Sequence, residues 1–133
     1  MKYSIIAAAA LCVLSTAATA DPVDGLWKTE PNEDGNYLQV SIQPCGSATC
    51  GTIDSAFDGS GDQVLDYEHL GKQMIWDMTP EGDGAYGGGK IWAPDKDKTY
   101  NSKMSLNGQN QLTVKGCVAG GLVCRGQTWT RVQ

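Results

Sequence analysis

The chain has 133 residues, of which 41% are hydrophobic, and it carries 15 acidic against 10 basic side chains, a formal charge of −5 at pH 7. An acidic chain repels phosphate backbones and anionic lipid headgroups, so we expect no nucleic-acid partner and no binding to an anionic membrane surface. The length suits one domain with a modest hydrophobic core.

Residues 1–20 have the three parts of a cleavable secretory signal. Lys2 supplies a positive charge, residues 5–14 are apolar, and Ala18-Thr19-Ala20 forms a small-x-small cleavage site. The apolar run is too short for a permanent membrane-spanning helix, and no other run approaches that length. We therefore expect a mature domain over residues 21–133, located in the periplasm or secreted, with no membrane insertion.

The mature chain alternates short strand-like runs with clusters of Gly, Asn, Asp and Pro, and no segment keeps a helical period. Strands are predicted near 24–29, 36–44, 50–57, 73–79, 85–93, 98–106, 111–118 and 122–132. Residues 58–72 are the least strand-like segment, so a loop or a single helical turn is expected there. About eight sequential strands without a crossover helix predict an all-β fold, an antiparallel up-and-down barrel, with a two-sheet sandwich as the alternative.

Cysteine spacing favours disulfides over metal. Cleavage of the signal removes Cys12 and leaves Cys45, Cys50, Cys117 and Cys124. An even number in a small exported domain predicts disulfides, and the spacings lack the tight pair that is typical of zinc sites. Three connectivities are open, and strand register favours Cys45–Cys50 and Cys117–Cys124.

The register argument uses the two hairpins that these pairs would close. A loop over 46–49 would place Ile42 opposite Ile53 and Val40 opposite Ser55 on one face, with the cysteines on the polar face. A one-residue slip would mix apolar and polar side chains on both faces.

The second hairpin sorts its side chains in the same way. With Cys117 opposite Cys124, Leu112 falls opposite Trp129 and Val114 opposite Gln127, so these four side chains share one face. That face is predicted to be the interior of the barrel.

Gly25-Leu26-Trp27 opens the first strand, and Arg131 ends the last. Closure of a barrel makes these strands neighbours, so the Arg131 guanidinium is expected to stack on the Trp27 indole at the barrel floor. We interpret Gly25, Trp27 and Arg131 as structural residues.

An ordered set of motifs runs through nearly the whole mature chain, in residues 21–30, 45–51, 88–92, 98–100 and 124–131. Together they resemble the domain-of-unknown-function 2147 family of exported bacterial proteins. The resemblance implies a lipocalin-like β-barrel in the periplasm or outside the cell, and it brings no function with it.

Arg125, Gln127 and Trp129 alternate onto the predicted inner face, where Tyr100 is expected to join them. Polar groups that point inward need hydrogen-bond partners. One interpretation is a ligand cavity with an apolar wall and a few orienting donors; the other is an internal polar network that fills a small barrel.

Catalytic and metal signals are weak. His69 is the one histidine, and no serine or cysteine stands in a nucleophile motif. Residues 58–62 look like an acidic calcium loop but lack the full pattern, so a solvated loop is expected. We expect no enzyme activity, no metal and no cofactor.

The sequence therefore predicts a lipocalin-like protein that binds a small, partly apolar molecule of unknown identity through Tyr100, Arg125, Gln127 and Trp129. The alternative is a protein-interaction or inhibitor module of the cell envelope with a filled barrel and a protein partner there.

Overall fold

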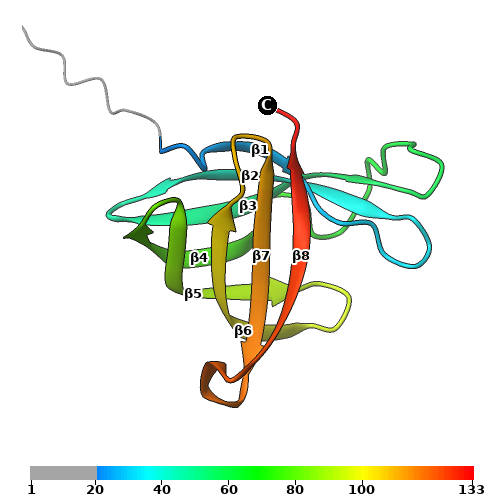
Figure 1. Ribbon diagram of the computed structural model, residues 1–133. Coiled ribbons are helices and arrows are strands. Elements are labelled where there is room, and N and C mark those ends of the chain that lie inside the picture. Colours follow the sequence, from blue (N-terminus) through cyan, green and yellow to red (C-terminus); the bar gives the residue numbers. More distant parts are fainter. Residues whose placement is uncertain (1–20) are drawn as a thin grey trace, which may run out of the picture.

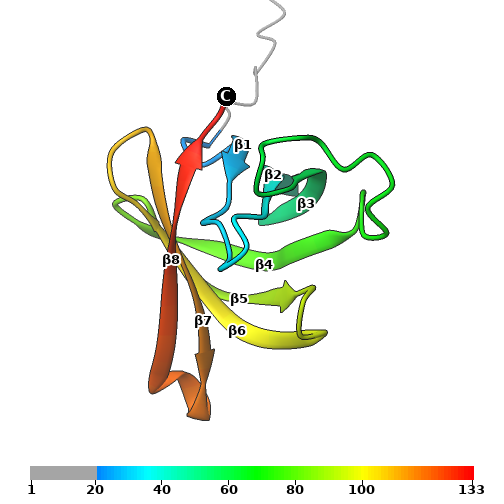
Figure 2. The ribbon, with the colours of Figure 1, turned by 90° about the vertical axis from the view of Figure 1, so that its right-hand side faces the viewer.

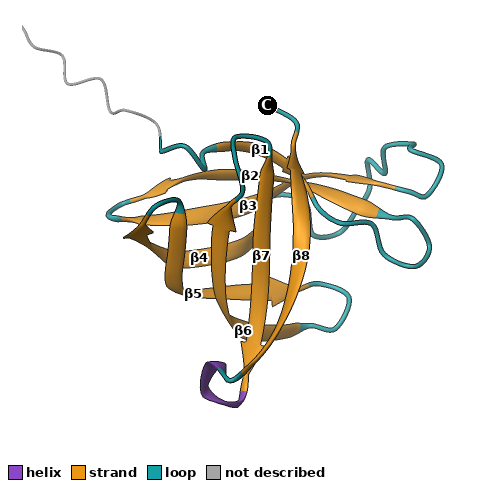
Figure 3. Ribbon diagram, viewed as in Figure 1, coloured by secondary structure: helices purple, strands orange, loops and turns teal. Residues whose placement is uncertain are grey.

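The computed structural model describes residues 21–133, so the predicted signal peptide lies outside the described residues. Eight antiparallel strands close into a barrel in chain order (Figures 1 and 3). The strands are β1 (Gly25–Lys28), β2 (Tyr37–Cys45), β3 (Ala48–Phe57), β4 (Gln73–Gly82), β5 (Ala85–Ala93), β6 (Lys98–Leu106), β7 (Gln111–Val118) and β8 (Val123–Arg131). This arrangement confirms the predicted up-and-down barrel and excludes the two-sheet sandwich.

Strand β8 pairs back with β1, through Trp27 with Arg131 and Lys28 with Thr130, and this pairing closes the barrel. Because successive hairpins point in opposite directions, the connections 29–36, 58–72, 94–97 and 119–122 all lie at one end, which we call the mouth. The start of β1 and the end of β8 lie together at the other end, which we call the floor (Figure 2).

The hydrophobic core fills the interior of the barrel from the floor up to Met74 and Ile75 at the mouth end of β4. Side chains on the inward faces of the strands are buried because alternate residues of a strand point to one face. The core cluster contains Val23, Trp27, Val40, Ile42, Ile53, Met74, Ile75, Met78, Tyr86, Met104, Leu112, Val114 and Trp129.

The structure defines the β4–β5 turn and the long connection between β3 and β4. Strand β4 extends past the predicted end at residue 79 to Gly82, because Asp83 and Gly84 make a tight turn with φ of 54° and 78°. Two successive positive φ values match the twist of a β-hairpin, so the flanking strands continue up to the turn. Residues 58–72 form turns with one isolated bridge, Phe57 to Gln63, so the loop expectation is confirmed.

The predicted register of the β2–β3 hairpin is wrong by two residues from the turn to Val40, and by one residue beyond the bulge between Gln39 and Val40. Cys45 lies opposite Ala48, and Cys50 lies opposite Gln43, so Val40 rather than Ile42 faces Ile53. The turn is shorter than predicted, because Gly46 adopts a φ of 63° and closes a two-residue connection. Between the turn and the bulge the shift is even, so the same side chains face inward and the apolar pattern could not reveal the error.

The predicted register of the β7–β8 hairpin is confirmed at every pair. Cys117 lies opposite Cys124, Val114 opposite Gln127 and Leu112 opposite Trp129. Between the cysteines, a short 3-10 turn, η1 (Ala119–Gly121), ends the hairpin, which extends beyond the body of the barrel (Figure 1).

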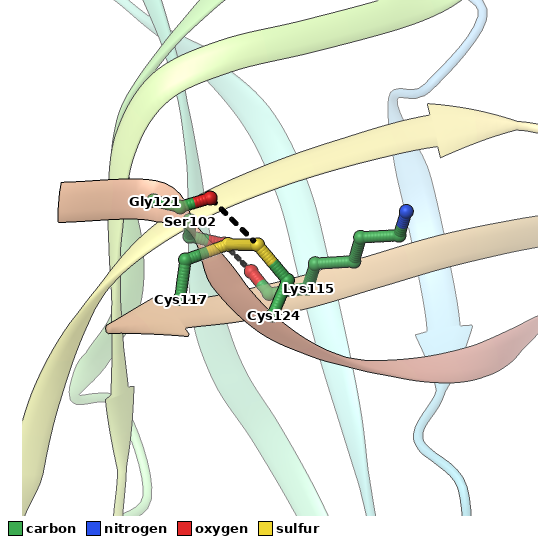
Figure 4. The surroundings of a disulfide bond; sticks show 5 residues. All are labelled: Ser102, Lys115, Cys117, Gly121 and Cys124. Carbon is green, nitrogen blue, oxygen red and sulfur yellow. Dashed lines mark hydrogen bonds between the residues drawn. A yellow bond between two sulfur atoms is a disulfide. The ribbon is translucent and has the colours of Figure 1, made fainter. Parts of the chain in front are cut away.

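Both predicted disulfides are present. Cys45 is bonded to Cys50 across the first hairpin, where the two cysteines are diagonal rather than opposite, and Cys117 is bonded to Cys124 across the second (Figure 4). Each bridge closes a short loop. Within residues 21–133 no helix is long and apolar enough to cross a membrane.

The Cys117→Ser, Cys124→Ser double variant should lose about 2 kcal/mol of unfolding free energy, because a bridge across a short loop removes little entropy from the unfolded chain. Denaturation in urea, compared with the wild type, measures the loss. The matching Cys45→Ser, Cys50→Ser variant should lose a similar amount; a loss below about 0.5 kcal/mol in both would contradict the loop-closure argument.

Candidate functional site

Trp27 and Arg131 form the floor of the barrel as the sequence predicted. The Trp27 indole is fully buried, and its Nε1 donates a 2.9 Å hydrogen bond to the carbonyl oxygen of Val23. The Arg131 guanidinium carbon lies 4.4 Å from the centre of the Trp27 ring. These contacts make the two residues parts of the scaffold.

Arg131 also ties three chain segments together through backbone carbonyls. Its guanidinium donates to Asp24 at 2.8 Å, to Gln109 at 2.6 Å and to Pro22. Gly25 passes so close that a Cβ there would lie 2.3 Å from the carbonyl oxygen of Gln133, and its φ is 138°. Glycine is therefore required at this position.

Asp24 carries the most unusual carboxylate of the floor. Its Oδ2 accepts a 3.0 Å hydrogen bond from the backbone nitrogen of Asp21, while Oδ1 is buried without a partner. Burial raises the pKa of Asp24, the hydrogen bond from Asp21 opposes that rise, and the charges of Asp21 and Arg131 act in opposite directions with smaller effect. This carboxylate holds the backbone at Asp21 at the floor and does not face the mouth.

The inner face of β8 changes character from floor to mouth. Trp129 is fully buried in the core, and its Nε1 donates a 3.1 Å hydrogen bond to Oε1 of Gln127. Gln127 and Arg125, the next two residues on that face, are exposed. The structure thus separates the predicted site residues: Trp129 belongs to the core, whereas Gln127 and Arg125 stand above it.

Tyr100 and Ile91 face Arg125 across a gap in side chains at Gly116. Arg125 pairs with Gly116, and a Cβ on Gly116 would lie 3.5 Å from Cβ of Tyr100 and 3.6 Å from Cγ2 of Ile91. Tyr100 and Ile91 are half-buried. We call Ile91, Tyr100, Gly116, Arg125 and Gln127 the mouth face; it offers two partly buried apolar surfaces beside one free guanidinium and one amide.

The sequence model of one bacterial family matches residues 25–131, and its description is an uncharacterized protein conserved in bacteria. The chain belongs to the DUF2147 family. No curated protein matches the chain in sequence. A solved structure of protein HP1028 from Helicobacter pylori, described as belonging to the lipocalin family, is similar with a TM-score of 0.65 at 17% identity. The match covers 83% of this chain and 82% of that one, so the DUF2147 barrel described here is lipocalin-like in fold.

Two hollows of this DUF2147 barrel lie on its outer surface rather than in the lumen. One has a volume of about 440 Å³ and the other about 190 Å³, and Glu81 and Lys103 line both. Neither is lined by Tyr100, Arg125, Gln127 or Trp129. The mouth face lies outside both hollows.

His69 belongs to a cluster at the rim of the mouth that could not be predicted from the sequence. Its Nδ1 lies 3.0 Å from Nζ of Lys72, its Nε2 lies 3.2 Å from Oε1 of Glu68, and its ring lies 4.9 Å from that of Trp92. An ammonium can only donate, so Nδ1 is the acceptor in the contact with Lys72. Burial, with the charges of Glu68 and Asp95, raises the pKa of neighbouring Tyr67. These contacts hold loop 58–72 against β5.

The acidic loop at 58–62 is held by its own backbone. Oδ1 of Asp58 accepts hydrogen bonds from the backbone nitrogens of Ser60, at 2.9 Å, and Asp62, at 3.1 Å. Within residues 21–133, no group of three or more His, Cys, Asp or Glu side chains is placed to hold a metal ion. The hydrogen bonds are those of an ordinary turn formed by aspartate.

Proposed function

We propose that this protein binds a small, partly apolar molecule with a polar or anionic end at the mouth of the barrel, and that binding rather than catalysis is its role. The observation that carries the proposal is the mouth face, where half-buried Tyr100 and Ile91 lie beside Arg125. Ligand sites commonly combine apolar walls with a few polar groups that fix orientation. The lipocalin-like fold adds support, because barrels of this size place such sites at their mouths.

We propose further that the protein works in the periplasm or outside the cell. Two disulfides support this location, since disulfides persist in oxidising compartments. The predicted signal peptide, which lies outside the described residues, points in the same direction.

Arg125 and Gln127 should respond differently to substitution. Arg125→Gln should leave unfolding free energy within about 0.5 kcal/mol of wild type, because the side chain is exposed. Gln127→Ala should lose about 1–2 kcal/mol, because the buried Trp129 indole loses its acceptor. Chemical denaturation measures both changes.

Native mass spectrometry of protein isolated from its own envelope compartment tests binding itself. A small-molecule adduct should be retained by wild type and by a Lys96→Gln control, and lost or weakened in Arg125→Gln. An adduct that is equally strong in Arg125→Gln would remove the mouth face from the proposal.

A second candidate, the protein-interaction module, is favoured by the tip of the β7–β8 hairpin. Leu122 is 88% exposed and is flanked by exposed Val123 and Val118, all between the bonded Cys117 and Cys124. A stapled apolar tip is pre-organised for contact with another surface. A protein partner that co-purifies with wild type and is lost with Leu122→Ser, in the absence of any small-molecule adduct, would favour this candidate.

A further inference from the structure

The outer face of β5, β6 and β7 gathers positive charge in a chain that is acidic as a whole. Lys103 of β6 lies directly opposite Lys115 of β7, and Lys90 lies on the neighbouring β5. These are three of the ten basic residues of the sequence. Within residues 21–133 none of the three has a carboxylate within 4.0 Å, since the ion pair found there joins His69 to Glu68.

Like charges placed directly opposite on adjacent strands destabilise a sheet. The pairing of Lys103 with Lys115 therefore opposes folding, and a bound anion would relieve it. Lys90 is fixed at the edge of the same region, because its Nζ donates a hydrogen bond to Oδ1 of Asn101 on β6. Glu81 is the one acidic residue that lines the two hollows, so with Lys90, Lys103 and Lys115 the local charge is positive.

The larger hollow lies beside Lys90 and Lys103. Gly87, Gly88 and Gly89 line it from β5, and Gly120 and Gly121 line it from the hairpin tip. A Cβ at Gly88, Gly120 or Gly121 would meet no atom within 4 Å, whereas the Glu81 carboxylate lies over Gly87 and the Met78 side chain over Gly89. The pairing of β5 with β6 shifts register between Tyr86 and Gly89, so Gly88 stands out of the ladder, and its φ is 69°. Glycines let a ligand approach the backbone closely, and exposed backbone N–H groups are donors for anions.

The disulfide fixes the far wall of this hollow. Cys117 lines the hollow, and Sγ of Cys124 contacts the carbonyl oxygen of Gly121 at 3.5 Å, so the tip is held over the end of β7. Oγ of buried Ser102 donates a 2.7 Å hydrogen bond to the carbonyl oxygen of Lys115, which joins β6 to β7 below it. Figure 4 shows the Lys115 side chain extending along β7, away from the disulfide. Lys90 and Lys103 line the larger hollow with the glycines, whereas Lys115 lines the smaller hollow, which Lys103 also borders.

From this arrangement we propose that the outer face of β5–β7 is a second binding site, separate from the mouth, for the phosphate monoester of a small molecule. We call the lysines 90, 103 and 115, with the glycines 87–89, the outer groove. Lysine binds phosphate as a compact point charge, and the pair of Lys103 and Lys115 supplies two such charges to one phosphoryl group. The hollow of about 440 Å³ next to it has room for the rest of the molecule.

The test is a titration of the 15N-labelled protein with inorganic pyrophosphate, followed through backbone amide chemical shifts. We expect saturable shifts at Gly87, Gly88, Gly120 and Gly121. The Lys103→Gln, Lys115→Gln variant should bind about tenfold more weakly, because it loses two charge-assisted contacts. Its melting temperature should equal or exceed that of wild type, because the like-charge pair has been removed, so loss of binding will not reflect unfolding.

A Lys96→Gln, Lys98→Gln variant is the matched control, because it removes the same charge from the β5–β6 connection and the first residue of β6, at the mouth. It should bind pyrophosphate as wild type does. Flotation with phosphatidylcholine vesicles, with and without phosphatidic acid, separates the two sources of the phosphate. Binding to phosphatidic acid vesicles that needs Lys103 and Lys115 would assign the phosphate to a lipid headgroup, whereas pyrophosphate shifts without vesicle binding would assign it to a soluble molecule.

The proposal is overturned if neither probe binds. It is equally overturned if the control variant weakens binding as much as the variant of the outer groove does, because the effect would then come from overall charge. Neither result bears on the mouth face, which contains none of these lysines.

Discussion

Trp27→Ala should lower the unfolding free energy by about 3–5 kcal/mol, the usual cost of removing a large, fully buried aromatic side chain. Trp27 has no exposed surface, packs in the core cluster and stacks its ring against the Arg131 guanidinium. A cavity there would open the floor at the point where the first and last strands meet. Urea denaturation followed by circular dichroism measures the loss.

Two further variants make the result specific. Trp27→Phe keeps most of the ring but leaves the carbonyl of Val23 without its donor, so a loss of about 1–3 kcal/mol is expected. Trp92→Ala removes a half-buried tryptophan from the rim and should lose less than Trp27→Ala. Equal losses of unfolding free energy for Trp27→Ala and Trp92→Ala would show that the floor contributes no more to stability than the rim does.

Arg131→Ala should cost about 2–4 kcal/mol, since a charged donor to backbone carbonyls contributes about 1.5–3 kcal/mol and the several bonds of one side chain are not additive. The side chain donates to Pro22 and Asp24 before β1 and to Gln109 in the β6–β7 turn, two segments far apart in sequence. Arg131→Lys should recover only part of the loss, because an ammonium cannot reproduce the planar fork of donors.

Arg125→Ala is the matched control for this experiment. It lies on the same strand and the same face as Arg131, but it is exposed and should change stability by less than about 0.5 kcal/mol. A double-mutant cycle of Arg131→Ala with Trp27→Phe measures how far the two side chains depend on each other. If Arg131→Ala proves as mild as Arg125→Ala, closure of the barrel does not depend on the guanidinium.

Strand order, barrel closure and the residues of the floor could be predicted, because in each case the sequence pattern allowed one arrangement of the strands. Alternation located the strands, and closure of eight strands placed Arg131 beside Trp27. The register of β2 and β3 could not be read in the same way. A shift of two residues preserves which side chains face inward, and only the tight turn at Gly46 distinguishes the two registers.

The shared face of Arg125, Gln127 and Trp129 was predictable, but the depth of each side chain was not. Alternation correctly placed Arg125, Gln127 and Trp129 on one face, but it carries no information on where along a strand the core ends. The lysines of the outer groove were missed for a similar reason. Their signal was the pairing of residues 98–106 with 111–118 across the Asn107-Gly108 turn, which sets Lys103 opposite Lys115.

The hydrogen bond between Asp21 and Asp24 connects export to the chemistry of the barrel floor. The donor is the backbone nitrogen of Asp21, the residue at which the mature protein is predicted to begin. Cleavage after Ala20 would convert that neutral amide into a positively charged α-ammonium group, 3.0 Å from a carboxylate whose pKa is otherwise raised by burial. The bond would then be an ion pair that favours the charged form of Asp24. Signal removal would thus add a positive charge to the floor, whereas in the uncleaved precursor Asp24 accepts only the hydrogen bond from a neutral amide.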